Sequence, residues 1–238
     1  MYSFNSRVRF SETDTNRKLS ITGVMNYLQD CSIFQSEDAG LGFAHVQETK
    51  KSWLLSAWNV EVVRRPDVAE EITIATWPYD FKGIYGLRNF AILDKDGNYL
   101  VKADSCWFLT DIVTGRPVRL TPEETSLYPV VEPRLDMEDL PRKIALPKEM
   151  ETVGTVPVMK QHLDTNLHVN NAQYVAIASE VLPKGAEICG IRAEYRKAAV
   201  LGDILSLKAA VDGDKYVVSL CAEDGSVYAN VELKVSTH

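Results

Sequence analysis

The stretch Val158-Met-Lys-Gln-His-Leu-Asp-Thr-Asn-Leu-His-Val-Asn-Asn-Ala-Gln-Tyr-Val-Ala-Ile-Ala-Ser-Glu-Val-Leu-Pro183 decides how the rest of the chain is interpreted. Its first part alternates as a β-strand does. Because every second side chain of an extended chain points the same way, Asp164, Asn166 and His168 are expected to share one face. The stretch therefore presents an acid, an amide and an imidazole side by side.

A helix is predicted directly after these three side chains. Asn170 and Asn171 are both favourable N-cap residues, and the apolar run that follows predicts a buried helix over about residues 171–182. Pro183 and Gly185 then end it. Free N–H groups and the positive end of the helix dipole favour a developing negative charge at its start, which suits the polarisation of a carbonyl group. The alternative is that His168 is simply a satisfied polar residue near a helix cap.

The same pattern occurs once more, near the start of the chain. Val8-Arg-Phe-Ser-Glu-Thr-Asp-Thr-Asn-Arg-Lys-Leu-Ser20 matches residues 158–170 at a constant offset, with Asp14 and Asn16 aligned to Asp164 and Asn166. Apolar residues at helical spacing predict a helix over about residues 20–38. Lys18 stands where the second copy has His168, and a lysine with a pKa of about 10 does not replace an imidazole near neutral pH. We therefore expect the second copy to carry the chemistry.

Strands follow each predicted helix in the same order. A strand with an acid near its middle comes first, Glu61 in residues 53–65 and Glu194 in residues 188–197, and a short apolar strand follows over residues 71–77 or 203–209. Asp-Gly turns at residues 95–98 and 223–226 then predict hairpins. Each copy thus reads as a strand, a helix and an antiparallel sheet, which places the chain in the α+β class with a sheet wrapped over a helix.

The motif Asp164-x-Asn-x-His-Val-Asn-Asn171, together with Ala193-Glu-Tyr-Arg-Lys197, resembles the acyl-acyl-carrier-protein (acyl-ACP) thioesterases. That resemblance covers the layout of nearly the whole chain. It implies a double hotdog fold, two tandem repeats that each wrap an antiparallel sheet around a long central helix. The expected parts are an N-terminal hotdog at 1–120 that lines the acyl pocket, a Pro-rich linker at 121–151 and a C-terminal catalytic hotdog at 152–238.

The resemblance also implies an activity: hydrolysis of fatty acyl-ACP, which releases the fatty acid and ends chain elongation. Asp164, Asn166 and His168 inherit catalytic roles from it. Thioester hydrolysis needs a placed water, a base and donors for the oxyanion. We assign proton transfer to His168, and Asp164 would orient it or raise its basicity. Asn166 and the helix-start N–H groups near Asn171 and Ala172 would bind the carbonyl oxygen or the oxyanion.

One departure from the family pattern bears on this mechanism. The better-known members place a catalytic Glu, often followed by Cys, where this sequence has Ala198 and Ala199. A cysteine nucleophile is thereby excluded at that place. Glu194, four residues earlier on the predicted strand, is the candidate substitute acid.

The expected partner is acyl carrier protein bearing a phosphopantetheine-linked acyl chain. The formal net charge of −7 argues against nucleic-acid binding. Because acyl carrier protein is acidic too, a local basic patch is needed, and the densest group of cations comprises Arg116, Arg119, Arg134, Arg142 and Lys143. A solvated linker with scattered charge is the alternative reading of these residues.

The remaining sequence features narrow the class of protein. The cysteines Cys31, Cys106, Cys189 and Cys221 fit no zinc or redox motif, so neither a metal nor a cofactor is expected. The longest apolar run is too short to span a membrane. The first residues resemble neither a signal peptide nor a transit peptide, which favours a bacterial-type cytoplasmic protein. A monomer and a homodimer are equally compatible with two repeats in one chain.

Two alternative functions are kept open. The missing acid at Ala198 favours a non-catalytic acyl-binding hotdog protein, whereas the complete set of Asp164, Asn166 and His168 opposes it. An acyl-CoA thioesterase is the other alternative, because these residues do not distinguish acyl carrier protein from CoA as the carrier.

Overall fold

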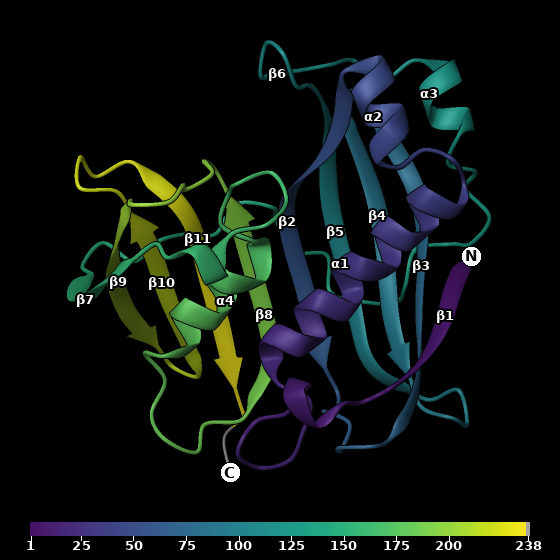
Figure 1. Cartoon of the computed structure of the whole chain (residues 1–238). Helices are drawn as coiled ribbons and strands as arrows, with labels where there is room; N and C mark the ends of the chain where they lie inside the picture. Colours follow the sequence, from purple (N-terminus) through teal and green to yellow (C-terminus); the bar gives the residue numbers. More distant parts are fainter. Residues whose placement is uncertain (237–238) are drawn as a thin grey trace. The chain divides into compact units, whose positions relative to one another are not determined.

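The structure, a computed structural model, describes residues 1–236. The chain divides into two compact units. The first comprises Met1–Ser56 and Val63–Asp139, and the second comprises Ala57–Val62 and the chain from Leu140 onward. Figure 1 labels the helices and strands in chain order. Among the described residues, no helix has the length and apolarity that crossing a membrane requires.

The first unit combines one long helix with an antiparallel sheet. Its elements are β1 (Tyr2–Arg7), α1 (Ile21–Asp38), α2 (Phe43–Thr49), the start of β2 (Lys51–Val62), β3 (Glu71–Lys82), β4 (Tyr85–Leu93), β5 (Tyr99–Asp111), β6 (Arg116–Pro117) and α3 (Pro122–Ser126).

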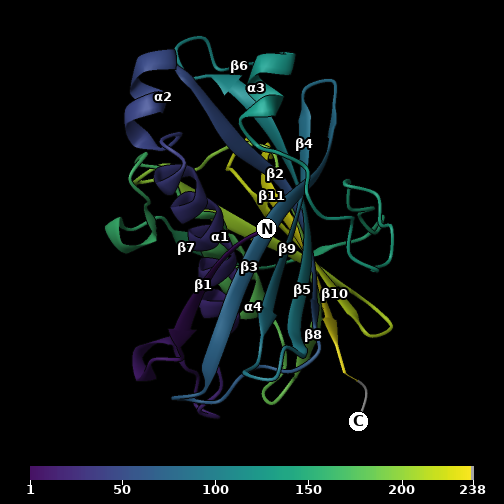
Figure 2. The same ribbon diagram turned by 90° about the vertical axis from the view of Figure 1, so that its right-hand side faces the viewer.

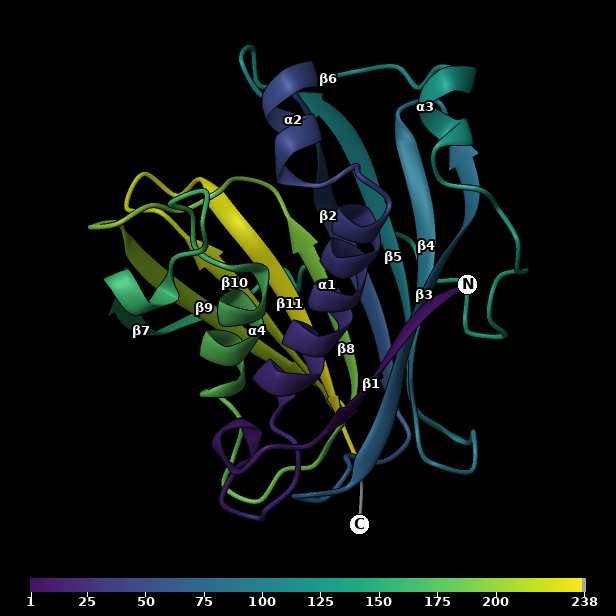
Figure 3. The ribbon, with the colours of Figure 1, turned by 45° about the vertical axis from the view of Figure 1, so that its right-hand side comes forward.

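The sheet of this unit runs in the order β1–β3–β4–β5, and β6 pairs with β5. Helix α1 packs on β1, β3 and β4, and Figure 3 shows it lying along these strands. The Ser20 side chain caps α1 by accepting a hydrogen bond from the Gly23 N–H (3.0 Å). Leu28 of the helix and Ile74 and Phe90 of the sheet are fully buried, so the core of the unit lies between the two layers.

The second unit repeats this plan with a shorter helix. Its elements are the end of β2, then β7 (Glu151–Pro157), α4 (Asn171–Ser179), β8 (Ile188–Tyr195), β9 (Ile204–Asp212), β10 (Lys215–Cys221) and β11 (Val227–Val235). Residues 57–61 of β2 pair with β8, and the order continues β8–β11–β10–β9–β7, antiparallel throughout. Helix α4 packs on β10 and β11.

Two helix predictions differ in their outcome. The first is confirmed, because α1 spans Ile21–Asp38. The second is three residues too long: α4 ends at Ser179, and the N–H groups of residues 180–182 bond three residues back rather than four, which is a tighter turn. One side of α4 is also only half-buried, at Asn171, Gln173 and Ala176, so the helix is not enclosed all round.

The expected strand through Ala198 is shorter too. Strand β8 ends at Tyr195, because the N–H groups of Arg196 and Lys197 both donate to the Tyr228 carbonyl oxygen (2.9 and 3.2 Å) and the regular ladder stops there. The equivalent strand of the first repeat, β2, is followed by the same arrangement, because the Val63 and Arg64 N–H groups both donate to the Leu100 carbonyl oxygen. Ala198 therefore lies in a loop.

The segment between the two repeats is anchored to the sheets. In the first unit Trp77 Nε1 donates to the Pro133 carbonyl oxygen (2.9 Å), and the Leu135 N–H donates to Asn89 Oδ1 (2.8 Å). In Figure 2 the stretch that follows α3 within the first unit runs on the side of β3–β5 opposite to α1. In the second unit Arg192 donates to the carbonyl oxygens of Pro141 and Lys143 (2.7 and 3.3 Å). The Pro-rich linker is thus held at specific positions.

We predict that Asn89→Ala destabilises the protein by about 1–3 kcal/mol, because it leaves the Leu135 N–H without its acceptor in a site where Asn89 is fully buried. Urea unfolding followed by tryptophan fluorescence measures this. Lys95→Ala, at an exposed turn of the same unit, is the matched control and is expected to change stability by no more than about 0.5 kcal/mol. Equal stability of the two variants would contradict the anchoring role.

Candidate active site

The turn that carries His168 is built around the carboxylate of Asp164. Asp164 Oδ1 accepts hydrogen bonds from the backbone N–H groups of Asn166 (2.8 Å) and His168 (3.2 Å). The Asp164 N–H in turn donates to the His168 carbonyl oxygen (2.8 Å). Leu167 between them adopts a left-handed φ of 62°. The carboxylate thus fixes the backbone of His168 rather than contacting its imidazole.

The His168 side chain is exposed and makes no hydrogen bond within residues 1–236, and the same holds for the Asn166 amide. The backbone of His168 forms a bridge with Val200. Next to it, the Val169 N–H donates to the Ala199 carbonyl oxygen (2.9 Å). The imidazole is therefore exposed to solvent on a backbone that hydrogen bonds hold on both sides.

A tyrosine supports this arrangement from α4. The Ala199 N–H donates to Tyr174 Oη (2.9 Å), and burial raises the pKa of Tyr174 to about 12. Its hydroxyl therefore stays protonated at neutral pH and serves as a neutral acceptor. Tyr174 also packs against Tyr195, with ring centroids 5.8 Å apart.

The start of α4 is already capped. Asn170 is the N-cap residue, and its Oδ1 accepts the Ala172 N–H (2.9 Å). The Asn171 carbonyl oxygen accepts the Tyr195 hydroxyl (3.0 Å). In this structure the Ala172 N–H, one of the expected oxyanion donors, is thus engaged by a side chain of its own helix.

Glu194 is not brought to His168. Its carboxylate accepts hydrogen bonds from the Ile144 N–H (3.2 Å) and from Asn230 Nδ2 (3.3 Å). Tyr195, the next residue, points to α4, and neighbouring strand residues point to opposite faces of a sheet. Glu194 therefore lies on the face of β8 that the linker covers, where it is 7% exposed.

Comparison with the first repeat shows where Ala198 lies relative to the turn of Asp164 and His168. Val8 and Val158 donate to the carbonyl oxygens of Glu70 and Asp203, and Leu19 and Val169 donate to those of Pro66 and Ala199. The acceptors lie in the loops that follow β2 and β8, and in each pair the second-repeat acceptor comes 133 residues after its first-repeat counterpart. By the same offset, Arg65 is the first-repeat counterpart of Ala198, and Asp67 is that of Val200.

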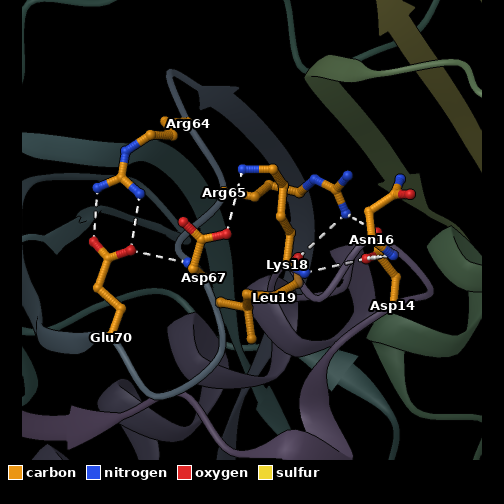
Figure 4. Close-up of polar contacts among 8 residues, drawn as sticks. All are labelled: Asp14, Asn16, Lys18, Leu19, Arg64, Arg65, Asp67 and Glu70. Atoms are coloured by element: carbon orange, nitrogen blue, oxygen red, sulfur yellow. Dashed lines mark hydrogen bonds and ion pairs between the residues drawn. The ribbon is translucent and has the colours of Figure 1, made fainter.

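Figure 4 shows the first-repeat site. Asp14 accepts from the backbone N–H groups of Asn16 (2.8 Å) and Lys18 (3.2 Å), as Asp164 does in the second repeat. Here the Arg65 guanidinium forms an ion pair with Asp14, and the Lys18 ammonium lies 3.6 Å from Asp67 Oδ1. The matching turn of the second repeat has no such ion pairs among the described residues, because Ala198 and Val200 replace Arg65 and Asp67.

The surroundings of the two turns differ in polarity. Leu167 precedes His168 and Val200 is its bridge partner, and these two side chains are exposed by 71% and 44%. Met159, Leu201 and Ile204 are exposed too, in the segments that backbone bonds of Val158 with Gly202 and Asp203 join, and we call these five residues the apolar rim. The corresponding first-repeat residues are mostly charged: Arg9, Arg17, Asp67, Val68 and Glu71. A shared backbone thus carries a charged surface in one repeat and an apolar one around His168.

The basic residues expected to form a docking patch are only partly available. Arg134 is bound to Asp104, with Nη2 2.9 Å and Nε 3.0 Å from its Oδ2. Arg116 and Arg119 are exposed on the first unit, and Arg119 borders a surface pocket of about 310 Å³ lined also by Phe81, Gly83 and Thr121.

Comparison with known proteins agrees with these motifs. Residues 1–128 match the acyl-ACP thioesterase N-terminal domain, and residues 146–234 match the acyl-ACP thioesterase C-terminal domain. The chain belongs to the acyl-ACP thioesterase family. The resemblance inferred from Asp164-x-Asn-x-His and Glu194-Tyr-Arg is thereby confirmed.

The sequence matches to several relatives cover nearly the whole chain. A chloroplastic palmitoyl-acyl carrier protein thioesterase from Cuphea hookeriana is 30% identical over 93% of this chain, and the chain spans 59% of that relative. Solved acyl-ACP thioesterases share the fold. The Bacteroides thetaiotaomicron protein superposes with a TM-score of 0.89 at 23% identity, covering 98% of this chain and 97% of its own. The 12:0-ACP thioesterase of Umbellularia californica gives 0.85 at 21%, covering 99% and 96%.

Sequence reasoning missed two groups of residues at these sites. Tyr174 and Tyr195 were assigned only to a helix and a strand, although they support the loop after β8 and the start of α4. Arg65 belongs to none of the motifs described above. Extending the internal repeat past the helices, at the offset of 133 residues that also aligns Glu61 with Glu194, would have paired Arg65 with Ala198.

We predict that Arg65→Met costs about 1–3 kcal/mol of stability at pH 7 and less at pH 3. The pKa of Asp14 lies below its usual value: burial raises it, but the Arg65 hydrogen bond and backbone donors together lower it by more. Such a carboxyl group adds stability above its unfolded pKa of about 3.9, and this is lost as pH falls through the folded pKa.

Urea unfolding at pH 7 and pH 3 measures the effect, with Arg116→Met as the matched loss of an exposed cation. A cost for Arg65→Met that is the same at both pH values would show that the Asp14 ion pair does not carry it.

Proposed function

We propose that this protein hydrolyses the thioester of fatty acyl-ACP, releasing a free fatty acid and ending chain elongation in fatty acid biosynthesis. The observation that carries the proposal is the exposed imidazole of His168, on a backbone held by the Asp164 turn and next to an apolar rim. In the proposed architecture of a double hotdog, residues 1–120 form the acyl-pocket half, residues 121–151 the linker and residues 152–238 the catalytic half.

In the proposed mechanism His168 accepts a proton from water as the water oxygen attacks the thioester carbonyl carbon. The carbonyl electron pair moves onto oxygen, and the exposed Asn166 amide donates to that oxyanion. The carbon–sulfur bond then breaks, and the imidazolium returns its proton to the leaving thiolate. Asp164 acts as a positioning residue, because its carboxylate fixes the backbone of His168.

Among the helix-start groups, the Asn171 N–H remains a proposed oxyanion donor. The Ala172 N–H can contribute only if Asn170 releases it. The carrier is proposed to be acyl carrier protein, with Arg116 and Arg119 as exposed cations for docking, and the protein to act in the cytoplasm as a monomer or homodimer. An acyl-binding protein without catalysis is the second candidate, which the absence of an acid at Ala198 favours.

The proposed function is tested by hydrolysis assays on matched acyl-ACP and acyl-CoA thioesters. His168→Ala is expected to lower kcat by about 10²–10⁴, because it removes the general base, whereas Lys18→Ala, the equivalent change in the first repeat, leaves kcat nearly unchanged. Melting temperatures of both variants exclude unfolding as the cause. Equal losses in the two variants, or no hydrolysis by the unmodified protein, would contradict the proposal.

The missing acid gives a second prediction. In the first repeat the side chain of Arg65 reaches the aspartate of the turn, so a long side chain at the equivalent position 198 is expected to reach the turn of Asp164 and His168. Ala198→Glu restores the acid that the better-known family members carry at this position, and it should raise kcat, by up to about 10²–10⁴ if the carboxylate acts as a full general base.

Thr152→Glu, on the exposed part of β7, is the matched control for added charge and is expected to leave kcat unchanged. A folded Ala198→Glu variant with unchanged or lower kcat would show that the turn does not use an acid from this position.

A further inference from the structure

Arg88 is a buried cation inside the first unit. It lies on β4, on the face of the sheet that carries α1, and is only 9% exposed. Its Nη1 donates to Gln35 of α1 and to Thr76 Oγ1 of β3 (3.1 Å). Both acceptors are neutral. Buried arginines are normally paired with an acid, because burying an unpaired charge is costly.

No carboxylate compensates this charge among residues 1–236. Burial lowers the pKa of Arg88 to about 10, and the groups that oppose this shift are Tyr128 and Cys31. The guanidinium is still charged at neutral pH. A carboxylate would lower the cost of that buried charge, so the site favours an anion that the protein itself does not supply.

The guanidinium also has an unused donor edge. Its Nε and Nη2 N–H groups donate to no group among the described residues, whereas Nη1 makes both side-chain bonds. The Nε–Nη2 edge presents two parallel N–H bonds, which match the two oxygens of a carboxylate. The unused donors therefore favour a planar carboxylate over a neutral acceptor with a single oxygen.

Aromatic side chains lie next to this guanidinium. The Arg88 guanidinium carbon is 5.8 Å from the centre of the Tyr128 ring. Trp53 packs edge-on against Tyr128, with centroids 6.1 Å apart, and lies 6.3 Å from Phe81. A cation at the end of an aromatic cluster suits a ligand that joins a carboxylate to an apolar chain.

The fold does not require an arginine here. The turn glycines Gly97 and Gly225 occupy equivalent hairpins, and counting back the same number of residues from each pairs Arg88 with Tyr216 of the second repeat. The second repeat builds the same strand pairing with a neutral side chain. A structural need of the sheet therefore does not explain the cation.

We propose that Arg88 binds the carboxylate of an amphipathic monocarboxylate through its Nε–Nη2 edge, with the apolar chain of that ligand against Tyr128, Trp53 and Phe81. The identification of this ligand as a fatty acid, the product of the reaction, rests on the proposed function. The site would retain or sense released product.

Isothermal titration of the intact protein with decanoate and with decanol, its uncharged counterpart, tests the site. The protein is expected to bind decanoate about 10- to 100-fold more tightly than decanol, as hydrogen bonds to a charged group predict. Arg88→Met should remove this preference, and Arg116→Met, the matched loss of an exposed arginine, should keep it. Equal affinities for the two ligands, or an Arg88→Met variant that keeps the preference, would overturn the proposal.

A second measurement does not depend on the folding of a variant. In protein labelled with ¹⁵N-arginine, decanoate should shift one arginine Nε–H resonance downfield and decanol should not. The absence of such a shift would also overturn the proposal. Neither measurement uses turnover, so the two proposals can fail separately. Decanoate binding without thioester hydrolysis would contradict the proposed function and support the Arg88 site. Thioester hydrolysis without a preference for decanoate would support the proposed function and contradict the Arg88 site.

Discussion

The carboxylate of one aspartate in each repeat holds the turn on which the site depends. Asp14 and Asp164 each accept two backbone N–H groups at matching distances, 2.8 and 3.2 Å, and each forces the third residue after it into a left-handed conformation. These bonds satisfy backbone N–H groups that would otherwise lack an acceptor in the turn before the helix. The residue that follows, Lys18 or His168, is presented from a fixed backbone whatever its side chain is.

The chemistry of the two repeats diverges on this shared backbone. In the first repeat the charged side chains are paired with one another: Asp14 with Arg65, and Lys18 with Asp67. In the second, alanine and valine at the corresponding positions leave the imidazole exposed next to the apolar rim. The two turns thus keep the same backbone bonds but carry different side chains. Arg88 adds a further asymmetry. It is a buried cation whose hydrogen-bond partners are neutral, and its second-repeat counterpart is Tyr216.

The linker shows what composition leaves open. Its prolines and charges predict a connector that is anything from ordered to loose, and the basic residues in it and just before it predict a docking patch. In the structure its backbone is bound to Asn89, Trp77 and Arg192, and Arg134 is bound to Asp104. Whether a charged residue is available to a partner depends on which acid the fold brings next to it, and Asp104 lies thirty residues from Arg134.

The sequence by itself determined the repeat, the helix α1, the hairpins and the family, because each of these depends on local spacing or on residues close together in the chain. It also singled out Asp164, Asn166 and His168, but it predicted an extended strand there, whereas the structure has a turn with Leu167 in a left-handed conformation. The tertiary structure alone decided where the remaining acids point. Strand β8 ends at Tyr195, so Ala198 lies in the loop beside the turn, and alternation along the strand turns Glu194 to the linker side. Those outcomes depend on pairing between distant strands, where a shift of one residue exchanges the two faces of a sheet.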